Sequence, residues 1–225
     1  MKNIIIVEGI SDKKFLEGYI AYLQETFPKK YFLIDDIKDA KGQDAIFSIL
    51  KSQKININKG ETKNIGILID ADEEGITSKI ENKINPAIEK AFNIKDSIKA
   101  LNQKSLILYE TKIVNIFCYI FNIDGKGELE DILKEIRTDK NAEIPICLDK
   151  FAECIKGFNE AYPEKEYKKN FIYFYGYECI RREGLNSEEI KSKLKGYEYY
   201  TPQYWNFEHD RLKELKHFLE LFQDF

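Results

Sequence analysis

The sequence has few of the residues that bind zinc. It contains four cysteines and two histidines, and the only positions are Cys118, Cys147, Cys154, Cys179, His209 and His217. The cysteines show no CxxC spacing and both histidines lie in one late segment, whereas zinc ligands usually occur as closely spaced pairs. Isolated cysteines in apolar surroundings, as in IFCYIF, are typical of a hydrophobic core. We therefore expect no zinc site.

Long apolar runs and an excess of positive charge are also missing. No stretch of 18 or more apolar residues occurs, and MKNIIIVEG reaches an acidic residue after only a few apolar ones, unlike a signal peptide. We therefore predict a cytoplasmic protein that has no membrane partner. The formal net charge of −4 argues against a protein that coats nucleic acid through its overall charge. A local basic groove or bridging divalent ions would still allow nucleic acid to bind.

Apolar runs alternate with amphipathic segments through the first half of the chain. The expected strands cover residues 3–8, 31–35, 65–70, 105–110 and 114–121, and the expected helices among them cover 12–27, 43–53 and 78–92. Such alternation is typical of βαβ units around a mostly parallel sheet flanked by helices. Runs such as IIIV and GILI fit strands that are covered on both faces. The sequence therefore predicts an α/β fold.

The pattern changes after residue 125 to charged segments with apolar residues at helical spacing. Expected helices cover residues 127–137, 145–158, 188–196 and 212–222, while 168–183 fits a buried helix or a strand. We assign residues 1–138 to the α/β domain and residues 139–225 to a helical C-terminal region. This region is expected to complete the core or to shape a substrate groove.

Acidic residues follow two of the expected strands. Asp70 and Asp72 come at the end of IGILID, and Glu8 comes at the end of IIIV. Alternate residues of a strand point the same way, and ligands of open α/β sheets bind at the carboxyl ends of strands. The three carboxylates would meet if the two strands are neighbours, and their repulsion would then need a proton or a cation, of which a divalent metal ion is the natural one. Oxygen ligands without histidine or thiolate favour Mg²⁺ or Mn²⁺ and phosphoryl-transfer chemistry.

Asp12 has two readings. It falls in the first turn of the helix that follows Glu8, with Ser11 placed to cap that helix and Gly9 allowing a sharp turn. An acid at this position complements the helix dipole. The alternative is that Asp12 is a further metal ligand.

Two motifs resemble the signature motifs of the Toprim domain. They are VEGISD (7–12) and IDADEEG (69–75), and DADEEG fits the DxDxEG pattern of type IA topoisomerases at every fixed position. Toprim is the catalytic domain of primases, type IA and II topoisomerases, ribonuclease M5 and OLD-family nucleases. GELEDIL (127–133) and the final YWNFEHDRLKELKHFLELF are similar to the DUF3226 Toprim-like family. The resemblance covers most of the chain and implies a Rossmannoid sheet.

The resemblance implies roles for the acidic residues. Glu8 would act as general acid or base in nucleotidyl transfer or hydrolysis, and Asp70 and Asp72 would bind Mg²⁺. A second ion would be held by Asp12 and one acid among Glu128, Glu130 and Asp131. The expected metal ligands are thus Glu8, Asp12, Asp70, Asp72 and Glu130, and the expected catalytic residues are Glu8, Asp70 and Asp72. The tyrosine nucleophile of topoisomerases is not recognisable, so strand passage is not expected.

Other readings of the same acids compete with this one. DADEEGITSKIE matches an EF-hand loop from Asp70 to Glu81, although IGILI before it is strand-like where a helix should stand. Phosphatases with an aspartyl nucleophile also carry DxD after a strand, usually the first one, and some glycosyltransferases bind metal through DxD. A further alternative is a non-catalytic Toprim-like module that binds nucleic acid or protein.

Basic and aromatic segments supply candidate contacts to nucleic acid, the expected partner. The basic candidates are Lys13–Lys14, residues 38–42, Lys168–Lys169 and Arg181–Arg182, any of which could instead be a solvated helix face. The tract KGYEYYTPQYW could stack unpaired bases or pack into a core. The sequence does not distinguish DNA from RNA as the substrate. It also does not decide whether the chain acts with a partner ATPase or as a homo-oligomer.

Overall fold

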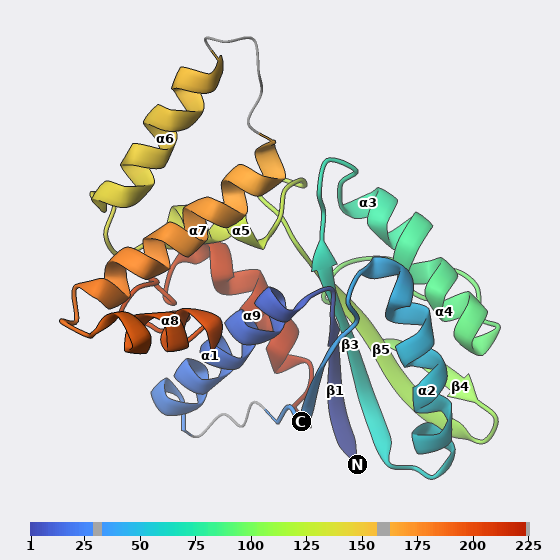
Figure 1. Ribbon diagram of the computed structural model, residues 1–225. Helices are drawn as coiled ribbons and strands as arrows, with labels where there is room; N and C mark the ends of the chain where they lie inside the picture. Colours follow the sequence, from blue (N-terminus) through green and yellow to red (C-terminus); the bar gives the residue numbers. More distant parts are fainter. Residues whose placement is uncertain (29–32, 157–162, 224–225) are drawn as a thin grey trace. The chain divides into compact units, whose positions relative to one another are not determined.

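The computed structural model describes residues 1–28, 33–156 and 163–223 (Figure 1). The chain forms two compact units. The first, here called the sheet unit, comprises Met1–Leu129 and Asp210–Phe225. The second, here called the helical unit, comprises Glu130–His209. The assignment of residues 1–138 and 139–225 to two regions stays a prediction.

A five-stranded sheet forms the centre of the sheet unit. Its strands are β1 (Lys2–Val7), β2 (Asp36–Asp39), β3 (Thr62–Asp70), β4 (Ser105–Tyr109) and β5 (Lys112–Phe121), in the order β2-β1-β3-β5-β4. Among the strand pairs of the described residues, only β4–β5 is antiparallel. The central strands are apolar on both sides, since every residue from Ile65 to Asp70 of β3 is buried. The mixed α/β class with a mostly parallel sheet is confirmed.

Helices cover both faces of this sheet (Figure 1). One face carries α2 (Ile46–Asn58), which follows a short 3₁₀ turn, η1 (Gln43–Ala45), together with α3 (Ile76–Lys79), a π-helical turn, η2 (Ile80–Ile84), and α4 (Asn85–Phe92). The other face carries α1 (Ile10–Thr26) and α9 (Lys213–Glu220), which follows the 3₁₀ turn η3 (Asp210–Leu212). The last helix of the chain therefore completes the core of the sheet unit.

Gly66 allows α9 to lie close to the sheet. A Cβ atom at this position would stand 2.6 Å from the Cζ atoms of both Phe218 and Phe222. The Phe222 ring also meets Phe117 of β5, with ring centroids 4.6 Å apart. Aromatic rings that pack edge to face in this way contribute beyond the area they bury. A glycine in the middle of the central strand is thus required by the approach of two aromatic side chains.

Three asparagines form a ladder across the sheet near the amino ends of the parallel strands. Asn3, Asn64 and Asn115 occupy one row of the β1–β3–β5 pairing. The Asn115 amide donates to Asn64 Oδ1 at 2.6 Å, and the Asn64 amide donates to Asn3 Oδ1 at 2.7 Å. The Asn3 amide in turn donates to the Leu33 and Phe222 carbonyls at 2.6 and 3.3 Å. The buried amides of Asn3 and Asn64 thus have partners, and the ladder connects the sheet to the end of the chain.

The helical unit is built around aromatic residues. Its helices are α5 (Leu129–Ile136), which begins at the last residue of the sheet unit, α6 (Glu143–Lys156), α7 (Glu164–Arg181) and α8 (Ser187–Lys195). Trp205 is fully buried, donates from Nε1 to the Tyr199 carbonyl at 2.7 Å, and packs on Tyr175 at 4.8 Å between ring centroids. Tyr199, Tyr200 and Tyr204 are buried as well. Four of the five rings of this tract therefore pack into a core, which is the alternative to base stacking that the sequence left open.

The expected elements differ from the observed ones mainly at their ends. Residues 168–181 of the segment 168–183 are helical, as the second part of α7, whereas Arg182 and Glu183 follow the helix. The strand expected over 31–35 lies later, at Asp36–Asp39, because main-chain pairing with β1 decides its position, and residues 31–32 lie outside the described residues. Residues 157–158 of the expected helix 145–158 also lie outside them. Among the described helices, none has both the length and the apolar character needed to cross a membrane.

Candidate functional site

The acidic motifs meet at the carboxyl end of the parallel strands. Glu8 directly follows β1, Asp70 ends β3, and these two strands are hydrogen-bonded neighbours, with Val7 paired to Leu68. The loop after β2 runs along the same edge, because the Gly42 N–H donates to the Glu8 carbonyl at 2.8 Å. The topology thus brings together the carboxyl ends of β1, β2 and β3, where open α/β sheets bind their ligands. We call this end of the sheet, with Glu8, Asp70 and Asp72, the carboxyl edge.

Gln43 connects the two acidic motifs. Its Nε2 donates to Glu8 Oε2 at 2.7 Å and reaches Asp72 Oδ2 at 3.3 Å. Two carboxylate oxygens that share one donor at these distances lie no more than about 6 Å apart. Glu8 and Asp72, which come from two different motifs, are therefore neighbours in space.

Lys79 lies beside Asp72 and is almost completely buried, with 1 % of its surface exposed. Its Nζ donates to Asp72 Oδ2 at 2.6 Å and to Gln43 Oε1 at 3.1 Å, and it stands 3.6 Å from Glu74. This lysine reaches the acids from α3, which begins after Gly75 at φ 83°. A buried ammonium needs a charged partner, and Asp72 supplies it. The lysine therefore neutralises part of the negative charge of the motif.

The backbone turns sharply between Asp70 and Asp72. Asp72 adopts φ 48°, in the left-handed region, and pairs through its main chain with Gly127 at 2.8 and 2.9 Å. Strand alternation therefore ends at Asp70, and the two carboxylates have different neighbours. An EF-hand is excluded, since β3 occupies the place of the helix that should precede such a loop.

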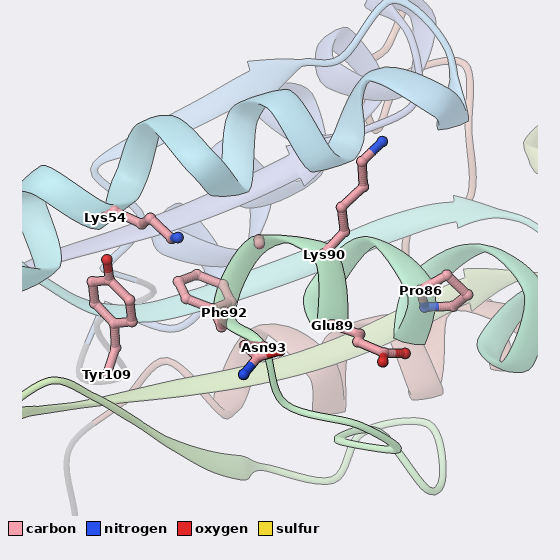
Figure 2. A pocket seen from close by; sticks show the side chains of 8 residues that line it. Lys54, Pro86, Glu89, Lys90, Phe92, Asn93 and Tyr109 are labelled. Atoms are coloured by element: carbon pink, nitrogen blue, oxygen red, sulfur yellow. The ribbon is translucent and has the colours of Figure 1, made fainter.

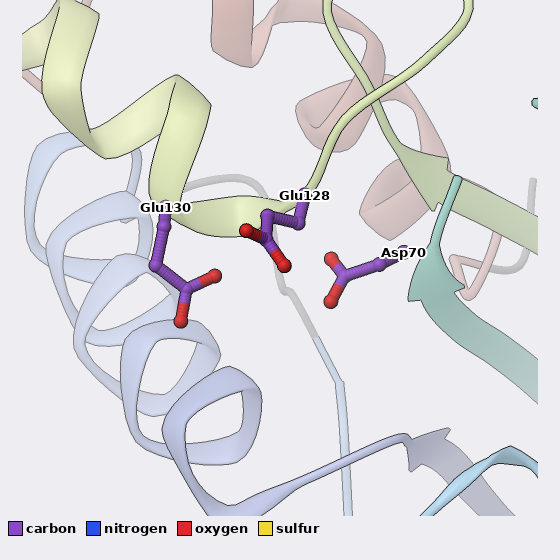
Figure 3. Close-up of side chains that lie close together, drawn as sticks. All are labelled: Asp70, Glu128 and Glu130. Carbon is purple, nitrogen blue, oxygen red and sulfur yellow. The ribbon is translucent and has the colours of Figure 1, made fainter. Parts of the chain in front are cut away.

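Asp70 lies with two glutamates that follow β5. Ligand oxygens of Asp70, Glu128 and Glu130 all lie within 4.8 Å of one another, and Figure 3 shows the three carboxyl groups close together. Asp70 Oδ1 also accepts from the Leu129 N–H at 2.9 Å. Asp70 and Glu128 belong to the sheet unit, and Glu130 follows two positions later at the start of α5. Carboxylate oxygens at such spacing are a suitable ligand set for a hard divalent cation.

The remaining predicted acids have other partners. Asp12 is buried and its Oδ2 accepts from the Gly9 N–H at 2.8 Å, which caps the start of α1. Asp131, in the helical unit, forms an ion pair with Lys168 at 2.9 Å. Glu8, Asp12 and Asp72 lie outside the group of three found among the described residues, and metal binding by any of the five predicted ligands stays a prediction.

Most of the basic residues proposed as contacts to nucleic acid form ion pairs with nearby carboxylates of this chain. Lys13 and Lys14 contact Glu17 at 3.9 and 2.8 Å. Lys38 pairs with Asp36 at 2.7 Å, and Arg182 pairs with Asp139 at 2.5 Å. These contacts match the reading of such residues as solvated surface positions. Lys41 differs, because it is exposed and precedes Gly42 in the loop beside Glu8.

A pocket of about 560 Å³ lies elsewhere in the sheet unit, where α2, α4 and β4 meet. Figure 2 shows Lys54 beside Tyr109, and the Lys54 Nζ lies 5.1 Å from the centre of that ring. Phe92 packs edge to face on the same ring at 5.6 Å. None of the predicted catalytic acids lines this pocket. It is therefore separate from the carboxyl edge.

Two residues of the carboxyl edge, Gln43 and Lys79, have no motif of their own in the sequence, and a third, Glu128, lies in GELEDIL. Gln43 and Lys79 stand in ordinary helical segments, and nothing in their sequence surroundings indicates that one joins two carboxylates and the other is buried. Glu128 was one of three acids considered together, and the structure places it with Asp70. Their positions depend on the tertiary fold.

Comparison with protein-family models gives a match to the family described as "Protein of unknown function (DUF3226)", over residues 2–224. Comparisons with curated proteins and with solved structures returned no significant match. The family match covers nearly the whole chain, including both units. This chain therefore belongs to the DUF3226 family.

Proposed function

We propose that this protein is a Toprim-like enzyme that cleaves or transfers phosphodiesters of nucleic acid with the help of Mg²⁺ or Mn²⁺. One observation carries the proposal: acids from separate strand ends converge at one edge of the sheet. Gln43 joins Glu8 to Asp72, and Asp70 lies with Glu128 and Glu130. Convergent carboxylates are unfavourable unless a cation or a proton compensates them.

The donor set fits a hard cation. Asp70, Glu128 and Glu130 offer only oxygen ligands, within 4.8 Å of one another, which suits Mg²⁺ or Mn²⁺ better than zinc. Such an ion, when bound, would polarise a phosphodiester and lower the pKa of a water molecule. On the other side of the edge, Lys79 already supplies a positive charge to Asp72. We therefore place the ion at Asp70 rather than at Asp72.

The other residues of the edge have roles that follow from their contacts. Glu8 accepts a hydrogen bond from Gln43, which holds its carboxylate toward Asp72, so Glu8 is positioned to take or return a proton at the reacting oxygen. Lys41 is exposed in the loop beside Glu8 and can contact a phosphate of the substrate. A local basic group of this kind suits a protein whose net charge is −4.

The test combines metal binding with turnover. Mn²⁺ binding is measured by titration calorimetry for the wild type and for Asp70→Asn, with Glu73→Gln as the control, because Glu73 is an exposed acid of the same motif outside the group of three. Turnover is measured on labelled single- and double-stranded DNA and RNA oligonucleotides with Mg²⁺ or Mn²⁺. Asp70→Asn should lose both binding and turnover, whereas Glu73→Gln should keep both.

The contrary result is equally clear. If Asp70→Asn binds Mn²⁺ as well as the control does, or if the wild type shows no metal-dependent turnover, the enzymatic proposal is refuted. A specific observation favours the alternative, a non-catalytic module that binds nucleic acid or protein: Lys79 neutralises Asp72 from within the chain, which reduces the need for a metal. Unchanged oligonucleotide binding by Asp70→Asn without any turnover by the wild type would support that alternative.

A further inference from the structure

The strand β4 leaves one edge of the sheet open among the described residues. It stands last in the strand order and pairs only with β5, as its place at the border of the sheet in Figure 1 shows. An edge strand presents unpaired N–H and C=O groups that another strand can bind. The main chain of β4 is therefore available for pairing.

One face of β4 is also apolar and exposed. Leu106 and Leu108 are 74 % and 63 % exposed, and Ile113 of β5, which pairs with Leu108, is 63 % exposed. Ile107, between the two leucines, points the other way into the core. Residues that face each other across an antiparallel pair lie on the same side of the sheet. The three exposed side chains therefore form one patch beside the open edge.

The opposite edge of the sheet is different. The strand β2 has the sequence DIKD, so three of its four residues are charged. Charged side chains on an edge strand oppose pairing with another chain. The sequence of β4 is SLILY and contains no charged residue and no proline. Of the two edges, only β4 lacks the usual protection against strand pairing.

We propose that β4 pairs antiparallel with β4 of a second copy of this chain, so that two sheets join across a two-fold axis. Centring the pair on Ile107 aligns all five residues of both strands. Leu106 then stands opposite Leu108 of the second copy, on the same face of the joined sheet. A contact of this kind uses the same surface on both copies and closes on itself.

The charges that flank β4 fit the same register. Lys104 precedes the strand, and Glu110 is the first residue of the turn that follows it, at φ 53°, so each Lys104 comes near Glu110 of the second copy. Both residues are exposed, and within the described part of the chain neither forms an ion pair. Oppositely charged residues that face each other across two strands stabilise the pair. A shift of the register by two residues would lose this match and part of the strand overlap.

The experiment measures mass in solution by light scattering after gel filtration, over a wide range of concentrations. The wild type should approach twice its monomer mass of 26.5 kDa as concentration rises. Leu108→Lys should stay monomeric, because it places charge in the centre of the patch. The matched control is Ile55→Lys, at a 64 % exposed position of α2, which should dimerise like the wild type.

Charge exchange tests the register itself. Lys104→Glu alone should weaken the dimer by about tenfold, because two carboxylates then face each other at each end of the pair. The double variant Lys104→Glu/Glu110→Lys should restore the wild-type affinity. Circular dichroism of every variant establishes that it is folded. A wild type that remains monomeric at the highest concentration, or a Leu108→Lys variant that dimerises as well as the control, would overturn the proposal. A double variant as weak as the single one would overturn the register.

Discussion

Replacing Asp72 with asparagine should destabilise the protein more than replacing its partner Lys79 with methionine. The two side chains form an ion pair at 2.6 Å, but they differ in burial, since the Lys79 side chain is 2 % exposed and the Asp72 side chain is 31 % exposed. Asp72→Asn leaves a buried ammonium without its nearest negative charge. Lys79→Met removes the buried charge and leaves a carboxylate that water can reach. The free energy of unfolding should therefore fall more for Asp72→Asn than for Lys79→Met.

The size of each effect depends on the contacts that remain in the variant. Removing one partner of a buried ion pair costs roughly 3–5 kcal/mol. Glu74 at 3.6 Å and Gln43 at 3.1 Å still face the Lys79 ammonium, so we expect about 2–3 kcal/mol for Asp72→Asn. Asparagine also tolerates the φ of 48° at this position, so backbone strain adds little. Lys79→Met, a replacement of similar volume, should cost less than about 1 kcal/mol.

The assay is urea unfolding followed by circular dichroism, for the wild type, both single variants and the double variant. The double variant should be about as stable as Lys79→Met alone, which gives a coupling energy above about 1 kcal/mol. The control is Glu74→Gln, which removes a half-exposed and more distant charge and should change stability by less than about 0.5 kcal/mol. Equal costs for the two single variants, or additive costs in the double variant, would refute the reasoning.

Two further predictions concern the core. Gly66→Ala should lower the free energy of unfolding by about 2 kcal/mol, because the new Cβ would stand 2.6 Å from Phe218 and Phe222; a thermal midpoint equal to that of the wild type would contradict the packing. Burial raises the pKa of the Cys118 thiol to about 12, so iodoacetamide at neutral pH should modify the exposed Cys147 but spare Cys118 until the protein unfolds, as read by peptide mass. The native state holds the Cys118 proton while the unfolded state loses it, so stability should fall as the pH rises from about 9 toward 12, and a Cys118→Ala variant should show a shallower decline in its urea midpoints.

The sequence predicts the fold well where hydrophobic pattern alone decides the structure. Runs such as GILI of β3 are apolar on both sides, and only a strand buried between two layers of helices accommodates them. The strand β2 has no such run, since DIKD is mostly charged, and its place follows from main-chain pairing with β1. The sequence therefore predicts this strand a few residues too early, over the apolar residues of 31–35.

The carboxyl edge is predictable in its position but not in its detail. Parallel strands bring Glu8 and the DADEEG motif to the same end of the sheet, which topology alone implies. The side-chain directions assumed an extended chain through Asp72, whereas the left-handed backbone there ends the alternation. The burial of Lys79 has no sequence signal, because its helix reads like any other charged amphipathic segment. Such contacts depend on which elements the fold brings together.

The asparagine ladder has a consequence for the opposite end of the same strands. Its amides run in one direction, since Asn115 donates to Asn64 and Asn64 donates to Asn3. A slip of β1 against β3 by a single position would leave the buried Asn3 and Asn64 amides without partners among apolar side chains. The register set at the amino ends of β1 and β3 also holds at their carboxyl ends, because β1 pairs with β3 along its whole length. The asparagine ladder therefore fixes the positions of Glu8 and Asp70 along the sheet without contacting either residue.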